Sequence, residues 1–187
     1  MMMTSTFRRY AAKGFTLIEL LIVVIIIAIL AAIAIPQFSN SSGDAQESAS
    51  IANLTTMRSA IELYRAQHNS TYPSKAPIGT APACTGGTPG TATDNTEATM
   101  ISQLTMYSNA SGHTCTVNAP GYTYGPYLRA IPIEPLTSSN VITVVTDIAT
   151  TPASDTTVGW RFVNTTGALQ INSTKKARDG TTLLSTK

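Results

Sequence analysis

The chain has 187 residues, of which 43% are hydrophobic and 12% are charged, and its formal net charge is +2 at pH 7. No basic stripe with interleaved aromatic residues is present, so the composition excludes nucleic acid as a primary partner. No nucleophile paired with a base, metal-ligand cluster or phosphate-binding glycine loop is visible either, so we do not expect an enzyme.

The N-terminal segment is basic and leads into a long apolar run. Residues 1–14 carry Arg8, Arg9 and Lys13 and no acid, a pattern that keeps a segment in the cytoplasm. In residues 15–35 the only polar side chains are Thr16 and Glu19. A helix of this length spans roughly 30 Å, enough to cross the core of a bilayer. We expect a single-pass membrane protein with its N-terminus in the cytoplasm and its remaining residues outside it.

The basic segment ends at Gly14, directly before the apolar run, whereas an ordinary secretory signal is cut after its apolar region. The basic leader, Gly14, Phe15 and Glu19, in this order, resemble the class III prepilin signature of the type IV pilin superfamily, which includes the type II secretion pseudopilins. The resemblance implies that a prepilin peptidase of the inner membrane removes residues 1–14 and N-methylates Phe15. An uncleaved signal anchor that holds a periplasmic domain is the alternative.

Glu19 needs a partner inside an apolar environment. Cleavage makes the α-amino group of Phe15 a cation at the start of a helix, and Glu19 lies one turn along on the same face. Glu19 can neutralise the amine of its own chain or that of an adjacent subunit. The resemblance implies the second, in which Glu19 sets the register of assembly because an unpaired buried charge is costly.

Pro36 lies near the end of the expected transmembrane and assembly helix, residues 15–38. Because proline removes a backbone donor and clashes with the preceding turn, we predict a kink or a locally melted segment there. The simpler alternative is that Pro36 only marks the point where the helix leaves the bilayer.

Residues 39–187 form the expected head, which begins with an amphipathic continuation of the helix. Its stop signals are at residues 68–73, and its apolar stripe is expected to pack on a small sheet. The stripe consists of Ile51, Leu54, Met57, Ile61 and Tyr64.

His68 and His113 have no neighbouring metal ligands in the sequence, so we expect no metal or catalytic role for them.

Residues 74–121 are rich in Thr, Ala, Gly and Pro and are expected to form a loop layer with one short helix at residues 97–107. Cys84 and Cys115 lie in this layer. Since it lies outside the cytoplasm, where disulfides persist, we expect them to pair. Free thiols, or a bond to another chain, are the alternatives.

Residues 125–135 resemble a segment of type II secretion major pseudopilins. In those proteins the following loop is often acidic and can bind calcium, whereas residues 136–140 here carry no carboxylate. Asp147 and Asp155 could supply oxygen ligands, but two separated acids make a poor calcium site. We expect no other cofactor.

The C-terminal residues favour β structure. Residues 141–148 are rich in β-branched side chains, and residues 158–163 and 168–171 flank a turn at residues 164–167, which predicts a hairpin. Trp160 and Phe162 alternate with Arg161, so one face is expected to be buried. The tail from Lys175 is polar and basic, and we expect it to be frayed or to contact other subunits. The fold class is therefore α+β, with a long N-terminal helix, half transmembrane and half amphipathic, packed on a small antiparallel sheet.

These features favour a structural subunit of a type IV pilus-like helical filament, either a pilin or a type II secretion pseudopilin, held together by packing of the N-terminal helices. Its expected partners are copies of itself, other pilins or pseudopilins, the prepilin peptidase and an inner-membrane assembly platform. The head would lie in the periplasm or on the cell surface. The alternative is a membrane-anchored periplasmic binding module that does not polymerise.

Overall fold

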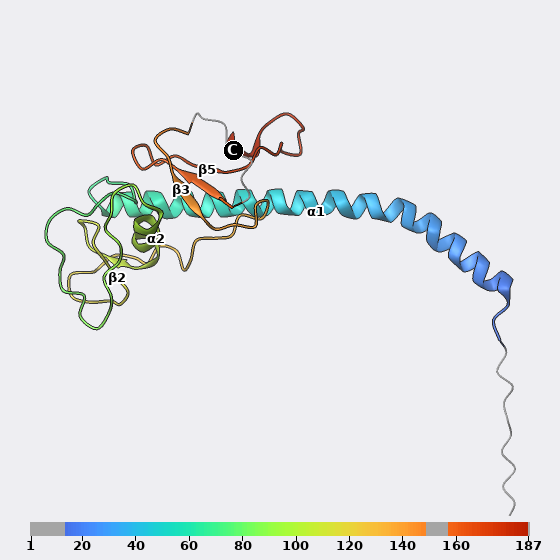
Figure 1. Cartoon of the computed structure of the whole chain (residues 1–187), viewed down its shortest axis with the longest axis horizontal. Coiled ribbons are helices and arrows are strands. Elements are labelled where there is room, and N and C mark those ends of the chain that lie inside the picture. Colours follow the sequence, from blue (N-terminus) through green and yellow to red (C-terminus); the bar gives the residue numbers. More distant parts are fainter. Residues whose placement is uncertain (1–13, 149–156, 187) are drawn as a thin grey trace, which may run out of the picture. The chain divides into compact units, whose positions relative to one another are not determined.

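The computed structural model describes residues 14–148 and 157–186, without the side chains of residues 36–41. It forms two compact units, Met1–Ser42 and Gly43–Lys187. The α+β class with a long N-terminal helix is confirmed. The elements, in chain order (Figure 1), are helices α1 (Leu17–Gln67) and α2 (Glu97–Thr105), strands β1 (Tyr107–Ser108), β2 (Thr114–Cys115), β3 (Ile142–Val144), β4 (Trp160–Phe162) and β5 (Leu169–Ile171), and the 3-10 turn η1 (Leu184–Thr186).

The core of the second unit forms on one face of α1. Its apolar side chains recur every three or four residues, so they share a stripe that packs against the sheet and α2. The stripe is the one expected from the sequence, and α1 ends at Gln67, beside the predicted stop. Four of its five members are fully buried in the main cluster: Leu54, Met57, Ile61 and Tyr64.

The C-terminal sheet is a mixed sheet of three strands in the order β3-β4-β5. The predicted hairpin is confirmed: β4 and β5 pair antiparallel, with Trp160 opposite Ile171. Its turn requires Gly167, because φ is +75° there and an added Cβ would lie 2.1 Å from the Tyr72 ring. β3 pairs with β4 in parallel rather than antiparallel.

The loop layer contains the predicted disulfide and short helix. Cys84 and Cys115 are bonded, with their Cα atoms 5.6 Å apart, and Cys115 packs in a second small cluster with Ala119 and Tyr122. The side chain of Thr96 accepts a hydrogen bond from the backbone of the first turn of α2, so this residue caps the helix.

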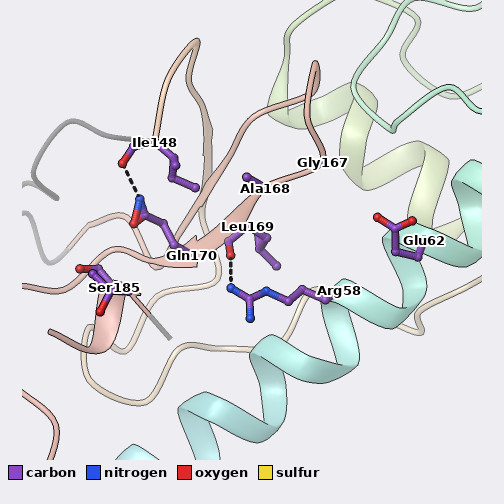
Figure 2. Close-up of a pocket in the computed structure, with 9 residues that line it drawn as sticks. Arg58, Glu62, Ile148, Gly167, Ala168, Leu169, Gln170 and Ser185 are labelled. Atoms are coloured by element: carbon purple, nitrogen blue, oxygen red, sulfur yellow. Dashed lines mark hydrogen bonds between the residues drawn. The ribbon is translucent and has the colours of Figure 1, made fainter. Parts of the chain in front are cut away.

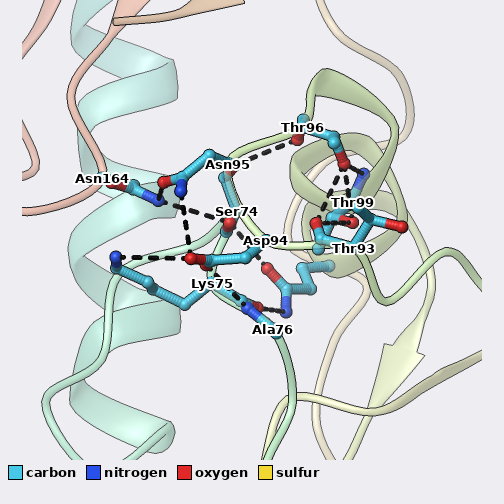
Figure 3. Close-up of polar contacts among 10 residues, drawn as sticks. Ser74, Lys75, Ala76, Thr93, Asp94, Asn95, Thr96, Thr99 and Asn164 are labelled. Atoms are coloured by element: carbon cyan, nitrogen blue, oxygen red, sulfur yellow. Dashed lines mark hydrogen bonds and ion pairs between the residues drawn. The ribbon is translucent and has the colours of Figure 1, made fainter. Parts of the chain in front are cut away.

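A polar network ties the loops to the hairpin (Figure 3). The backbone oxygen of Ser74 accepts from the Asn95 N–H at 2.8 Å and from Asn164 Nδ2 at 3.3 Å. The Ser74 hydroxyl donates to the Thr96 oxygen at 2.9 Å. Because Asn164 belongs to the hairpin turn, these bonds hold together the segment after α1, the start of α2 and the sheet.

Residues 125–135, called the strap below, run alongside α1 in the opposite direction. Tyr127 donates its hydroxyl hydrogen to Gln67 Oε1 at 2.6 Å. Further along the strap, the Ile133 oxygen accepts from Asn53 Nδ2 at 3.1 Å. As the residue numbers increase along the strap, those of its partners in α1 decrease. The strap therefore runs antiparallel to the helix and covers one of its flanks.

Glu134, at the end of the strap, is a fully buried carboxylate. Ser50 of α1 donates its hydroxyl hydrogen to Oε1 at 2.6 Å, and Thr137 donates its backbone N–H at 2.6 Å and its hydroxyl at 2.9 Å to Oε2. These donors replace the water that burial removes, so Glu134 fixes the strap to α1.

The face of β4 that carries Arg161 is also buried. The side chain of Arg161 is only 7% exposed, and Gln170, which lies opposite it in β5, donates to the Ile148 oxygen at 3.0 Å. The segment that contains Ile148 therefore contacts the face that alternation alone would leave to solvent.

The expectation of a frayed tail is wrong for the residues that the structure describes. Leu184 is 2% exposed, and the Arg178 guanidinium lies 3.3 Å from the Asp44 carboxylate of α1. The Arg178 backbone N–H also donates to Glu47 Oε2 at 2.8 Å. The tail thus packs on the second half of α1.

Candidate functional site

The start of α1 carries the residues that the sequence singles out. Gly14 and Phe15 precede the helix, and the Phe15 side chain is 87% exposed. The predicted cleavage point therefore lies in accessible, non-helical chain. The leader, residues 1–13, lies outside the described residues.

Thr16 and Glu19 form a reciprocal capping box. The Thr16 backbone N–H and hydroxyl both donate to Glu19 Oε2 at 2.8 Å, and the Glu19 N–H donates to the Thr16 hydroxyl oxygen at 3.2 Å. Thr16 thereby caps α1, and one carboxylate oxygen of Glu19 gains two donors within its own chain. Sequence reasoning missed this role of Thr16, although the Thr-x-x-Glu spacing is its ordinary signal.

From Leu20 to Ile35, α1 is apolar, and no other part of the described chain buries it. Leu17–Ile35 is long and apolar enough to cross a membrane, and none of that segment is buried inside the molecule. Such a surface requires either lipid or other apolar helices around it. The pairing of Glu19 with an amine of another copy is a property of an assembly and stays a prediction.

Two other predicted positions stay untested. α1 is continuous through residue 36 in the single chain, and the kink or locally melted segment at Pro36 stays a prediction. Asp155 lies outside the described residues, so calcium binding with Asp147 also stays a prediction. Within residues 14–148 and 157–186, no group of three or more His, Cys, Asp and Glu side chains could hold a metal.

His68 has a packing role. It is 1% exposed, its ring stacks on Tyr64 at 3.7 Å, and its nitrogens contact the Tyr64 oxygen at 2.7 Å and the Ser108 hydroxyl at 3.0 Å. Burial lowers the pKa of His68 below its usual value, against the raising effect of its hydrogen bond to the Tyr64 backbone. A neutral imidazole satisfies both contacts, one as donor and one as acceptor.

A pocket of about 440 Å³ lies between α1, β5 and the C-terminal turn (Figure 2). Arg58 lines it, but its guanidinium donates to the Leu169 oxygen at 2.8 Å. Glu62, the carboxylate in the lining, lies 3.3 Å from Arg65. Both charged groups are thus engaged within the chain, so the start of α1 remains the stronger candidate.

Comparisons with known proteins agree with this assignment. A family model described as the prokaryotic N-terminal methylation motif matches residues 9–35. The type IV major fimbrial protein FimA of Dichelobacter nodosus is 60% identical over 50 residues, which cover 27% of this chain and 32% of FimA. The type II secretion system core protein G of Klebsiella michiganensis is 31% identical over 67 residues, or 36% of this chain and 46% of that protein.

A third relative is matched over most of its length. The type IV narrow pilus major component PilA5 of Thermus thermophilus is 36% identical over 114 residues, which cover 60% of this chain and 91% of PilA5. No solved structure matches the chain significantly. The match spans about a third of the FimA relatives, and most of PilA5. The chain belongs to the type IV pilin and pseudopilin superfamily.

Proposed function

We propose that this chain is a structural subunit of a type IV pilus-like helical filament, assembled through packing of its N-terminal helices. The observation that carries the proposal is the segment Leu17–Ile35, a helix with an uncovered apolar surface and a carboxylate, Glu19, at its start. In the membrane, lipid covers this surface. In a filament, the helices of other copies cover it, so one segment serves both as anchor and as assembly core.

The proposal includes processing of the N-terminus. Cleavage after Gly14 by a prepilin peptidase exposes the amine of Phe15, which is then methylated and becomes available to Glu19 of another copy. The leader keeps the N-terminus cytoplasmic before cleavage, the helix holds the subunit in the inner membrane, and an assembly platform extracts it into the filament.

Within the superfamily we propose a pilus rather than a secretion pseudopilus. The match covers 91% of PilA5, which is named as a pilus component. It covers 46% of the core protein G, which is named for type II secretion. The strap resembles a pseudopilin segment and supports the second candidate, a subunit of a secretion pseudopilus.

The test separates the charge of Glu19 from its capping role. Glu19→Gln keeps an oxygen that can accept from Thr16 and removes the charge, whereas Glu19→Ala removes both. We expect electron microscopy of sheared surface material to show filaments for the native chain and to show none for either variant. The matched control is Glu62→Gln, which makes the same change at an exposed head position and should leave filaments intact.

Mass spectrometry of the processed N-terminus completes the test. We expect cleaved, methylated Phe15 in the native chain. Normal filaments from Glu19→Gln, with none from Glu19→Ala, would mean that capping is the essential role. A correctly processed native chain without filaments, with a head that still captures a ligand, would instead indicate a membrane-anchored binding module.

A further inference from the structure

A second, smaller pocket lies in the head, beside the end of α1. Its volume is about 160 Å³, which is room for a small molecule and not only for a single water. The last turn of α1 supplies Tyr64, the chain just after α1 supplies His68, and α2 supplies Gln103. Loop residues at positions 75–78 and 110–112 complete most of the lining.

Two of the lining side chains are buried and already hydrogen-bonded. Gln103 is 1% exposed, and its Oε1 accepts from the Ser74 backbone N–H at 2.7 Å. Its Nε2 donates to the Lys75 oxygen at 2.9 Å and to the Gly112 oxygen at 3.2 Å. Both ring nitrogens of His68 have contacts as well. These groups therefore shape the pocket, and their polar atoms are engaged within the chain.

The hydroxyl group of Tyr64 differs from them, because no residue in the described part of the chain forms a hydrogen bond with it. Tyr64 is 1% exposed, and its ring is fixed by the stack on His68. The hydroxyl points to the lining at Gly112, where an added Cβ would lie 3.1 Å from it. The absence of a side chain at Gly112 thus leaves this hydroxyl open to the pocket.

The Tyr64 hydroxyl is a donor in this environment. Burial, with a smaller effect of Tyr127, raises the pKa of Tyr64, so the hydroxyl keeps its proton at neutral pH. A buried donor without an acceptor costs free energy. An acceptor atom of a ligand in the pocket would remove this cost.

The other open groups of the lining also favour an acceptor. Thr71 and Ser111 line the pocket, and within the described residues their hydroxyls have no hydrogen-bond partner. Lys75 is the only charged residue among the described lining residues, which include no carboxylate. Its ammonium group lies 3.9 Å from Asp94, outside the lining (Figure 3). Several donors with one cation and no anion suit a ligand that carries a single negative charge.

We propose that this pocket binds a small monocarboxylate of the size of lactate. One carboxylate oxygen accepts the hydrogen of the Tyr64 hydroxyl, and Lys75 neutralises the charge. A carboxylate fits better than a phosphate, because the lining supplies one cation for one charge. The apolar end of the ligand contacts Ile78, a lining residue that is 78% exposed. The inference concerns the head alone and does not depend on the proposed filament.

The test is a titration of isotope-labelled lactate into the full chain in detergent, followed by broadening of the lactate NMR signals. Tyr64→Phe removes only the hydroxyl, and Lys75→Gln removes only the charge. We expect saturable binding to the native chain and about tenfold weaker binding to each variant. Tyr72→Phe, which removes a tyrosine hydroxyl outside this lining, is the matched control and should keep the affinity within about twofold.

Lactamide, which has nearly the shape of lactate but no charge, completes the test and should bind about tenfold more weakly than lactate. Tyr64→Phe breaks no described hydrogen bond, so its unfolding midpoint should equal that of the native chain and a loss of binding is not a loss of folding. The inference is overturned if lactate does not bind saturably to the native chain, if Tyr64→Phe binds it equally well, or if lactamide binds as tightly. None of these results affects the proposed function, which depends on the filaments seen by electron microscopy.

Discussion

Removing the disulfide should destabilise the whole head, and not only the loop layer. The bond closes a loop with a sequence separation of 31, for which the chain-entropy model gives about 3.7 kcal/mol at 25 °C. The loop contains α2, whose Met100 and Leu104 are fully buried in the main core. Unfolding of the core therefore releases the loop, and the constraint acts on the global free energy of unfolding.

The measurement is urea or thermal unfolding of the full chain in detergent, followed by the fluorescence of Trp160. This is the only tryptophan, and it lies in the main core rather than in the disulfide cluster. The double variant Cys84→Ala/Cys115→Ala should lose about 3 to 4 kcal/mol, a large part of the stability of an ordinary domain. For a unit of this size, the loss corresponds to a fall in Tm of roughly 10 °C.

Reduction of the native chain provides the control. It should lower the midpoint by a similar amount, and the double variant should not respond to reductant. An unchanged Trp160 midpoint in the double variant would refute the reasoning, because it would show that the loop layer unfolds independently of the core.

Three further predictions concern the head in the same preparation. Glu134→Ala leaves the donors from the helix and the strap without their acceptor and should cost about 2 to 4 kcal/mol of unfolding free energy in urea titrations. Because the folded state lowers the pKa of His68 below 6.5, its stabilising contribution is complete above pH 6.5 and is lost as the pH falls below that value. Unfolding midpoints should show this slope, and His68→Gln should flatten it. Gly167→Ala should lower the Tm by several degrees, since its Cβ would clash with Tyr72 in a positive-φ turn.

The features that the sequence predicts well are those set by local spacing. The α1 stripe follows from helical periodicity, because any partner placed on that face buries Leu54, Met57 and Ile61 together. The hairpin follows from a turn of four residues, and the disulfide from two cysteines in a segment expected to lie outside the cytoplasm. The N-terminal signature is equally local, which explains why residues 9–35 alone match a family model.

The features that the sequence did not predict depend on contacts between distant segments. Ser50 and Glu134 are separated by 84 residues, and nothing near either residue indicates the pair. Arg161 is buried on a face that the earlier segment containing Ile148 contacts, so alternation within β4 could not show it. The packed tail depends on the contact between Arg178 and Asp44 of α1. The residues around neither side chain predict this contact.

α1 combines three different surfaces in the head, and this division limits how it can vary. The stripe packs on the sheet, the charged flank bonds to β5 and the tail, and the uncharged positions Ala52, Thr56 and Ser59 are exposed on a third face. We expect that a charge introduced on this third face, as in Ser59→Lys, leaves the folded head intact but is buried without a partner in the proposed filament. A charge on the flank, such as Glu62→Lys, remains exposed in both states. Loss of filaments from the first variant but not from the second, with equal head stability, would show that the face of α1 opposite its core has an assembly role.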